Sequence, residues 1–251
     1  MVRFVGAGSG DPELITLKGA RLLGEADVVI YAGSLVNPAL LGYCREGARL
    51  YNSAEMTLEQ VINVIKSAEK DGLMTVRLHT GDPCLYGAIR EQIDILDAMG
   101  IQWDITPGVS SFCGAAASLG AEYTLPDVSQ TVIITRLSGR TAVPESEKLA
   151  ALAAHGATMV IFLSAGMTDR VQTELLKGAY SEATPAAVVY KATWPEERIV
   201  RCTVGTLHEE CVRAGIHSTA LILVGDFLGD NYQRSKLYDP TFTTGWRRGT
   251  E

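Results

Sequence analysis

The chain has 251 residues, of which 47 % are hydrophobic and 20 % charged. This length and composition exclude a disordered or fibrous chain and fit one large domain or two of moderate size. The formal net charge of −7 argues against a protein that binds nucleic acid through a basic surface.

The N-terminus runs directly into a strand pattern at Val2–Gly6, which predicts that no signal peptide is present. The longest uncharged stretch, Leu149–Thr168, has the length of a membrane span, but His155 and Gly156 interrupt it. We interpret it as the end of a helix, a glycine turn and a buried strand, and therefore expect no membrane segment.

The first half alternates short apolar runs with helical patterns. Five strands are predicted, in chain order, over Val2–Gly6, Val28–Ala32, Arg49–Tyr51, Thr75–Leu78 and Gln102–Thr106. One helix is indicated by apolar side chains at helical spacing, namely Leu58, Val61, Ile62 and Ile65. Thr57 and Gln60 offer it a capping box, and a second helix follows Gly87. Strands that alternate with helices are typical of βαβ units, so we expect an α/β domain with a mainly parallel five-stranded sheet.

The second half is predicted to be another α/β domain. Its strands are expected over Thr131–Thr135, Thr158–Leu163, Ala186–Tyr190, Ile199–Thr203 and Thr219–Val224. Residues 188–202 leave no room for a helix between two strands, which indicates an antiparallel pair and a mixed sheet. A helix is expected over Thr206–Ala214, with a capping box of Thr206 and Glu209. We place the two domains at residues 1–112 and 113–251, the second ending in a polar tail after Gly229.

The cysteines and histidines do not form an evident metal or disulfide pattern. Cys211 and His208 have helical spacing, and His217 follows, but a tetrahedral zinc set needs four ligands at close spacings. We therefore expect no metal. Five cysteines are scattered without CxxC spacing, as free thiols of a reducing cytoplasm would be: Cys44, Cys84, Cys113, Cys202 and Cys211.

A glycine-rich loop follows the first predicted strand, with the sequence Val5-Gly6-Ala7-Gly8-Ser9-Gly10-Asp11-Pro12. A dinucleotide-binding loop is excluded on two grounds. Asp11 stands where the dinucleotide fingerprint has its last glycine, and no acidic residue follows the second strand to bind a ribose. A phosphate loop is also excluded, because no GK[ST] sequence is present. The loop is either a plain strand-to-helix turn or a ligand-binding turn of a different class.

Two further polar loops follow predicted strands. They are Thr80-Gly81-Asp82-Pro83 after the fourth strand and Thr106-Pro107-Gly108-Val109-Ser110-Ser111 after the fifth. Each alone is explained by an ordinary turn. Because the carboxyl ends of parallel strands meet at one edge of a sheet, three such loops together favour a ligand site there.

These three segments, in this order, resemble the S-adenosylmethionine-dependent tetrapyrrole methylases, and the resemblance runs from Val2 to about Gly225. It implies two α/β domains, S-adenosylmethionine in the cleft between them, S-adenosylhomocysteine as product, a tetrapyrrole substrate and a cytoplasmic homodimer. Ser9 stands where the family usually has Pro, and Leu163 where several relatives have Met. The cofactor-binding residues that the resemblance implies are Ser9, Gly81, Asp82, Leu85, Ser110, Ser111, Leu163, Ala192 and Ala220.

Three segments resemble one subgroup, whose members methylate ring carbon 11 of precorrin-4 or cobalt-precorrin-4 in cobalamin biosynthesis. They are the segments 31–38, 135–141 and 235–240. Methylation of another ring carbon or of diphthine is the alternative within the family, and a non-catalytic adenosyl-ligand module is the alternative outside it.

The substrate carries several carboxylates and the protein is acidic, so cations are expected at the substrate site. Arg136 and Arg140 are our candidates, with a solvated loop as the competing interpretation. No catalytic base is identified. His79 lies at the appropriate edge of the first sheet, but a strand-end histidine bonded to the backbone is the better interpretation.

Overall fold

The structure is a computed structural model that describes residues 1–250, and it divides into two compact units. The first contains Met1–Ala115 together with Lys191–Glu197, and the second contains Ala116–Tyr190 and Arg198–Glu251. The division falls within helix α4 (Ser111–Leu119), three residues beyond the expected junction, and the segment 191–197 joins the first unit. The sequence pattern did not predict α4, whose Ala-rich run lacks an apolar stripe.

The first unit contains an entirely parallel five-stranded sheet in the order β3-β2-β4-β1-β5. This confirms the predicted parallel sheet. Each strand begins and ends within one residue of its expected bounds: β1 is Val2–Gly6, β2 Val28–Tyr31, β3 Arg49–Asn52, β4 Thr75–His79 and β5 Trp103–Thr106.

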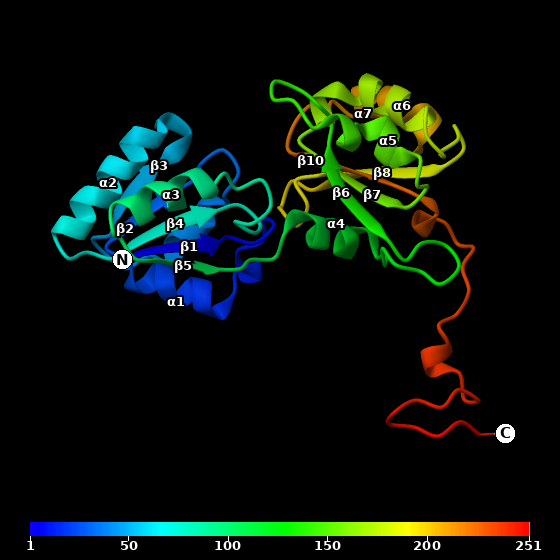
Figure 1. The fold of residues 1–251 in the computed structure, drawn as a ribbon, viewed down its shortest axis with the longest axis horizontal. Helices are drawn as coiled ribbons and strands as arrows, with labels where there is room; N and C mark the ends of the chain where they lie inside the picture. Colours follow the sequence, from blue (N-terminus) through cyan, green and yellow to red (C-terminus); the bar gives the residue numbers. More distant parts are fainter. Residues whose placement is uncertain (251) are drawn as a thin grey trace. The chain divides into compact units, whose positions relative to one another are not determined.

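Helices cover both faces of this sheet, as Figure 1 shows. Helix α1 (Leu17–Glu25) lies on one face, and α2 (Leu58–Lys70) and α3 (Arg90–Ala98) lie on the other. The predicted capping box of α2 is present: the Thr57 hydroxyl accepts from the Gln60 N–H at 3.3 Å, and the Gln60 side chain accepts from the Thr57 N–H at 2.8 Å. Because the face of α2 that meets the sheet is apolar, burial of its isoleucines fixes the helix there.

The second unit contains a mixed sheet in the order β6-β7-β10-β8-β9. Only β6 and β7 are parallel, and the pair β8 and β9 is antiparallel, as the short connection between them predicts. The strands again agree with expectation to within one residue: β6 is Val132–Arg136, β7 Thr158–Phe162, β8 Pro185–Tyr190, β9 Arg198–Thr203 and β10 Ala220–Val224.

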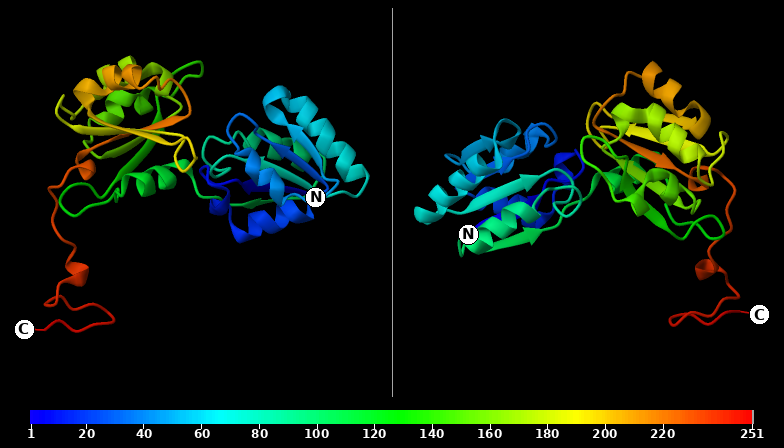
Figure 2. Two further views of the ribbon diagram at one scale, coloured as in Figure 1. Left: turned by 180° about the vertical axis from the view of Figure 1, so that it is seen from behind. Right: turned by 45° about the horizontal axis from the view of Figure 1, so that its top comes forward.

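Three helices cover one face of the second sheet (Figure 2). They are α5 (Leu149–Ala153), α6 (Thr168–Leu176) and α7 (Leu207–Arg213). The expected capping box of α7 is wrong. The Thr206 hydroxyl accepts from the Thr203 N–H at 3.1 Å, and Glu209 pairs with Arg213 at 2.6 Å, so the cap belongs to the preceding single turn of 3-10 helix.

The uncharged stretch 149–168 contains the end of α5, a left-handed Gly156 and the buried strand β7, as expected. Among residues 1–250, no helix has the length and apolar character needed to cross a membrane. After Gly229 the chain leaves the second sheet and extends away from it (Figure 1).

Candidate functional site

The carboxyl edge of the first sheet holds the three polar loops that the sequence singled out. After β1 the chain crosses to α1 on one face, whereas after β4 it crosses to α3 on the other. The chain therefore leaves the neighbouring strands β1 and β4 toward opposite faces of the sheet. In an open α/β sheet, ligands bind in the crevice between two loops that diverge in this way.

Glycine backbones interlock across this edge. The Gly8 N–H donates to the Gly81 carbonyl at 3.3 Å, and the Gly81 N–H donates to the Gly8 carbonyl at 2.8 Å. A Cβ on Gly108 would lie 2.2 Å from the Gly81 carbonyl oxygen and 2.7 Å from the Cα of Gly6. Only glycine allows the three loops to approach this closely, and the close approach leaves backbone rather than side chains at the surface of the site.

Asp82 joins two of these loops. One carboxylate oxygen accepts from the Cys84 N–H at 2.7 Å, and the other accepts from the Gly108 N–H at 2.9 Å. Both oxygens are thus engaged by backbone donors, and the half-buried carboxylate fixes the loop after β5 to the loop after β4. Asp82 therefore holds the two loops in place relative to each other.

Ser9 is buried and tied to the segment 191–197. Its hydroxyl lies 2.9 Å from the Thr193 hydroxyl, which also accepts from the Asp11 N–H at 3.1 Å. The Trp194 indole N–H donates to the Ser9 carbonyl at 3.2 Å. The same indole covers Gly10, where a Cβ would lie 2.1 Å from the ring. The glycine-rich loop is therefore held in one conformation by residues that come nearly two hundred positions later.

Most of the predicted cofactor residues come together in the first unit. A Cβ on Gly81 would lie 3.4 Å from Ser110 Cα and from the Ser111 nitrogen. Ala192 is buried, at 6 % exposed, and immediately precedes Thr193, which contacts the glycine-rich loop. Leu85 belongs to the same loop as Asp82, because its N–H donates to the Asp82 carbonyl at 3.2 Å. The structure thus brings together Ser9, Gly81, Asp82, Leu85, Ser110, Ser111 and Ala192.

Two polar atoms at the ends of strands β4 and β5 are buried without a hydrogen-bond partner among residues 1–250: His79 Nε2 and Thr106 Oγ1. Burial, with a smaller contribution from the charge of Arg77, lowers the pKa of His79 to about 3. The imidazole is therefore neutral at physiological pH.

Arg77 is itself buried and donates to the Ile30 carbonyl at 3.1 Å and to Gln92 at 3.2 Å, so it is a structural cation of the first unit.

The remaining two predicted cofactor residues are Leu163 and Ala220. They lie just after the end of β7 and at the start of β10, two adjacent strands in the middle of the second sheet. The pairing of β10 with β7 places Ile222 opposite Ile161, so extending this register by two residues places Ala220 level with Leu163. Leu163 is 64 % exposed and has a φ of 52°, a conformation that is strained for a leucine. An exposed apolar side chain held in a strained backbone is typical of a functional position.

The two candidate substrate cations differ. The Arg136 guanidinium donates to three carbonyls of the loop after β6, those of Leu137 at 3.4 Å, Thr141 at 3.1 Å and Ala142 at 2.8 Å. The Arg136 side chain therefore stabilises the conformation of this loop. Arg140 is exposed in the same loop, where a carboxylate can reach it from solvent.

Backbone strain is the signal that sequence analysis missed. Six non-glycine residues with left-handed φ lie in loops at strand ends, and neither composition nor periodicity reveals them. They are Tyr86, Ala88, Lys191 and Thr193 in the first unit, and Leu163 and Thr219 in the second. A β-branched residue in this conformation is a genuine outlier, so Thr193 and Thr219 mark loops whose shape is imposed by their surroundings.

Among residues 1–250, no group of three or more His, Cys, Asp or Glu side chains could hold a metal ion. His208 Nδ1 lies 2.9 Å from the Thr168 hydroxyl. Burial and the charge of Glu210 raise the pKa of Cys211 to about 11, which keeps it a thiol rather than a metal-binding thiolate.

The comparisons with known proteins agree with this geometry. Residues 1–208 match the family model of the tetrapyrrole (corrin/porphyrin) methylases. The chain belongs to this family. The cobalt-precorrin-4 C(11)-methyltransferase of Methanocaldococcus jannaschii is 56 % identical over 248 residues, which are 98 % of this chain and 96 % of the relative.

Solved structures of two tetrapyrrole methylases are also similar. A cobalt-precorrin-4 methyltransferase of cobalamin biosynthesis superposes with a TM-score of 0.89 at 48 % identity, covering 91 % of this chain and 96 % of that one. The uroporphyrin-III C-methyltransferase of Thermus thermophilus, complexed with S-adenosylhomocysteine, has a TM-score of 0.75 at 28 % identity, covering 90 % and 92 %.

The carboxyl edge of the first sheet fits an adenosyl ligand in its chemistry. Gly81 presents backbone at the surface of the site, and a side chain there would contact Ser110 and Ser111. The orphaned Thr106 hydroxyl and the half-buried Leu85 add a polar and an apolar group to the same edge. A nucleoside with a polar amino acid portion needs such a mixture of backbone donors and apolar surface.

Proposed function

We propose that this tetrapyrrole methylase transfers a methyl group from S-adenosylmethionine to ring carbon 11 of precorrin-4 or cobalt-precorrin-4. The observation that carries the proposal is the 56 % identity, over 98 % of the chain, to a relative that bears this activity in its name. The interlocked glycine loops at the carboxyl edge of the first sheet provide the matching site.

The same geometry supports the proposed cofactor residues. Seven residues of the first unit hold S-adenosylmethionine: Ser9, Gly81, Asp82, Leu85, Ser110, Ser111 and Ala192. Glycine and loop positions offer backbone groups to the ligand. Asp82 and Ser9 are already bonded within the protein, so they act by fixing the loops. Leu163 and Ala220 of the second unit are further predicted contacts.

The chain's own contribution to the reaction is to bind, orient and exclude water. S-adenosylmethionine supplies a methyl group that its positive sulfur has already activated, so alignment with the acceptor carbon accounts for most of the acceleration expected from the protein. Loops fixed by Asp82 and by the bond between Ser9 and Thr193 are suited to this task, because they do not have to reorganise when the ligand binds.

A general base is not assigned. His79 is buried, and its pKa of about 3 makes the imidazole a weak acceptor for a proton from the substrate. Substrate carboxylates are held by exposed cations, for which Arg140 is our candidate, whereas Arg136 supports the loop that carries Arg140.

We also propose a homodimer, on the grounds of the family. Light scattering during gel filtration measures the mass of the purified chain. A mass twice that of the 26.9 kDa chain is expected, and a monomer over the micromolar range would contradict the proposal.

Turnover with both acceptors tests the proposed reaction. Purified protein and isotopically labelled S-adenosylmethionine are incubated with precorrin-4 and, separately, with cobalt-precorrin-4, and the new methyl is located by NMR. Methylation at carbon 11 of either acceptor supports the proposal and tells which one is used. A methyl at another ring carbon identifies a different specificity, and binding of the cofactor without transfer to either acceptor identifies a non-catalytic module.

A further inference from the structure

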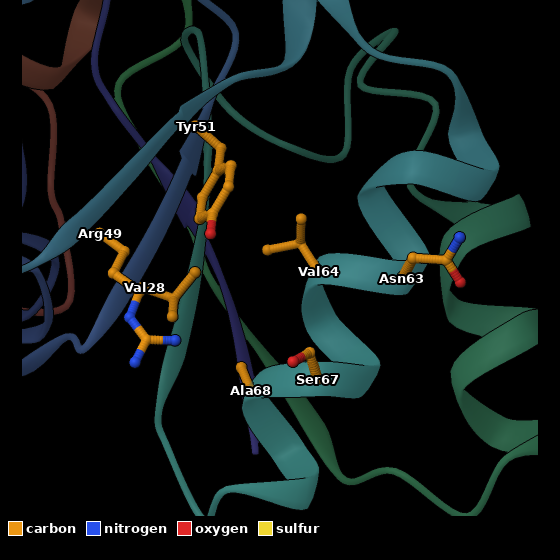
Figure 3. A pocket seen from close by; sticks show the side chains of 7 residues that line it. All are labelled: Val28, Arg49, Tyr51, Asn63, Val64, Ser67 and Ala68. Carbon is orange, nitrogen blue, oxygen red and sulfur yellow. The ribbon is translucent and has the colours of Figure 1, made fainter.

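A cavity of about 280 Å³ lies between the edge strand β3 and helix α2 of the first unit (Figure 3). Val28 and Arg49 are the first residues of β2 and β3, so the cavity lies at the amino edge of the sheet, opposite the glycine loops. It therefore belongs to a different part of the unit from the candidate cofactor site. Seven residues line it: Val28, Arg49, Tyr51, Asn63, Val64, Ser67 and Ala68.

Three hydrogen-bond donors face this cavity. The guanidinium of Arg49 and the hydroxyl of Tyr51 enter it from the strand, and the hydroxyl of Ser67 enters it from the helix, whereas the Asn63 amide points away (Figure 3). Among residues 1–250, the side chains of Arg49, Tyr51 and Ser67 form no hydrogen bond or ion pair; Arg49 and Ser67 are exposed and Tyr51 is half-buried. None of the lining residues is acidic. The cavity thus presents a cation and two hydroxyls that have no partner within the protein.

Carboxylates near the cavity in the sequence have partners elsewhere. Asp27, which precedes Val28, binds the Arg45 guanidinium through one oxygen and accepts from the Met74 N–H at 2.7 Å through the other. Glu69, which follows Ala68, binds the N-terminal ammonium. The charge of Arg49 is therefore available to an external anion.

Three of the lining residues are apolar. Val28 and Ala68 are 1 % and 2 % exposed, so a ligand can cover little of either, whereas Val64 is half-buried and still offers apolar surface. Inorganic phosphate would use the donors alone. An organic acid with a small branched carbon body would use the donors and Val64.

We propose that this cavity is a binding site for a small organic carboxylate, whose carboxylate is held by Arg49, Tyr51 and Ser67 and whose carbon body contacts Val64. The planar guanidinium fork matches a carboxylate, and the two hydroxyls occupy its remaining lone pairs. For a ligand with few heavy atoms, a dissociation constant of roughly millimolar is expected. The site is independent of the cofactor, because it lies at the other edge of the sheet.

The proposal is tested with isobutyrate as the probe and the full chain as the protein. Backbone amide resonances are followed by NMR during titration with isobutyrate, with its neutral amide, isobutyramide, and with inorganic phosphate. The expected result is saturable shifts of the Val28, Arg49 and Ser67 amides with isobutyrate, with at least about tenfold weaker binding of isobutyramide and of phosphate. Arg49→Met should weaken isobutyrate binding about tenfold or more.

Lys66→Met is the matched control, because Lys66 is an exposed cation next to Ser67 that does not line the cavity. It should leave the dissociation constant of isobutyrate within about twofold of the parent. Ser67→Ala gives a second, milder variant should Arg49→Met alter the fold, which circular dichroism reports. Absence of saturable shifts, tighter binding of phosphate than of isobutyrate, or equal loss in Lys66→Met and Arg49→Met would overturn the proposal.

Discussion

The hydroxyls of Ser9 and Thr193 lie 2.9 Å apart, although 184 positions separate the two residues in the sequence. Thr193 has a φ of 68°, so this strained residue is held in place to reach Ser9 and the Asp11 N–H. The glycine-rich loop after β1 therefore depends on a segment that folds with the first unit but follows β8 in the chain.

Thr193→Val should weaken S-adenosylhomocysteine binding, because valine keeps the β-branched shape and removes the hydroxyl that fixes the loop. The expected loss is about 1 kcal/mol, or about fivefold in the dissociation constant measured by calorimetry. Ser9→Ala should have a similar effect. Because both variants remove the same bond, the double variant should lose less affinity than the sum of the two, and strict additivity would show that the bond is not the cause.

Gly81→Ala should impair cofactor binding more than Gly100→Ala. Both glycines have a left-handed φ, 58° and 68°, so each substitution should cost about 1 kcal/mol of folding free energy. Only at Gly81 would the new Cβ contact Ser110 and Ser111, because no atom lies within 4 Å of a Cβ at Gly100. Melting temperature and the dissociation constant of S-adenosylhomocysteine are measured for both, and equal affinities would remove Gly81 from the site.

Asp82→Ala should loosen two loops at once. Its carboxylate accepts one backbone N–H through each oxygen, and each charge-assisted bond contributes about 1.5 kcal/mol at this half-exposed position. Hydrogen exchange at the Gly108 and Cys84 amides should accelerate, and cofactor affinity should fall about tenfold or more. Asp82→Asn keeps one accepting oxygen and should fall between Asp82→Ala and the parent. Unchanged exchange at Gly108 in Asp82→Ala would contradict the assigned role.

Arg140→Ala and Arg136→Ala should differ in kind. Arg140→Ala should raise the KM for the tetrapyrrole while leaving cofactor affinity and melting temperature unchanged, since the side chain is exposed. Arg136→Ala should lower the melting temperature, because three loop carbonyls lose their donor. Arg140→Lys should restore part of the affinity for the acceptor, because it keeps the charge and not the fork. A parental KM in Arg140→Ala would place the substrate cations elsewhere.

His79 should make the protein less stable as the pH falls. In the folded chain its pKa is about 3, whereas the unfolded chain has the ordinary value near 6.5. Between these values the unfolded state binds a proton that the folded state does not, so stability is complete above pH 6.5 and decreases toward pH 3. The loss from this residue should reach about 2 kcal/mol at pH 5. In denaturant titrations, His79→Gln should reduce this pH dependence, and an unchanged slope would refute the assignment.

The sequence by itself determined the strands and the sites of the loops. Apolar runs and helical spacings predicted all ten strands to within one residue, because burial on a sheet imposes a local pattern on residues such as Val28–Tyr31. The same local pattern placed Gly81 and Gly108 at the ends of β4 and β5, and so identified the edge at which the candidate site lies.

Tertiary structure decided which of these residues contact one another and what each does. Asp82 bonds Gly108, Thr193 bonds Ser9 and Arg136 bonds the carbonyls of its own loop, and no local pattern specifies such partners. Helix α4 was missed for a related reason, since its alanines give no periodic signal. Local periodicity records only whether a residue is buried, whereas hydrogen bonds between distant loops and left-handed strain arise only when the chain has closed on itself.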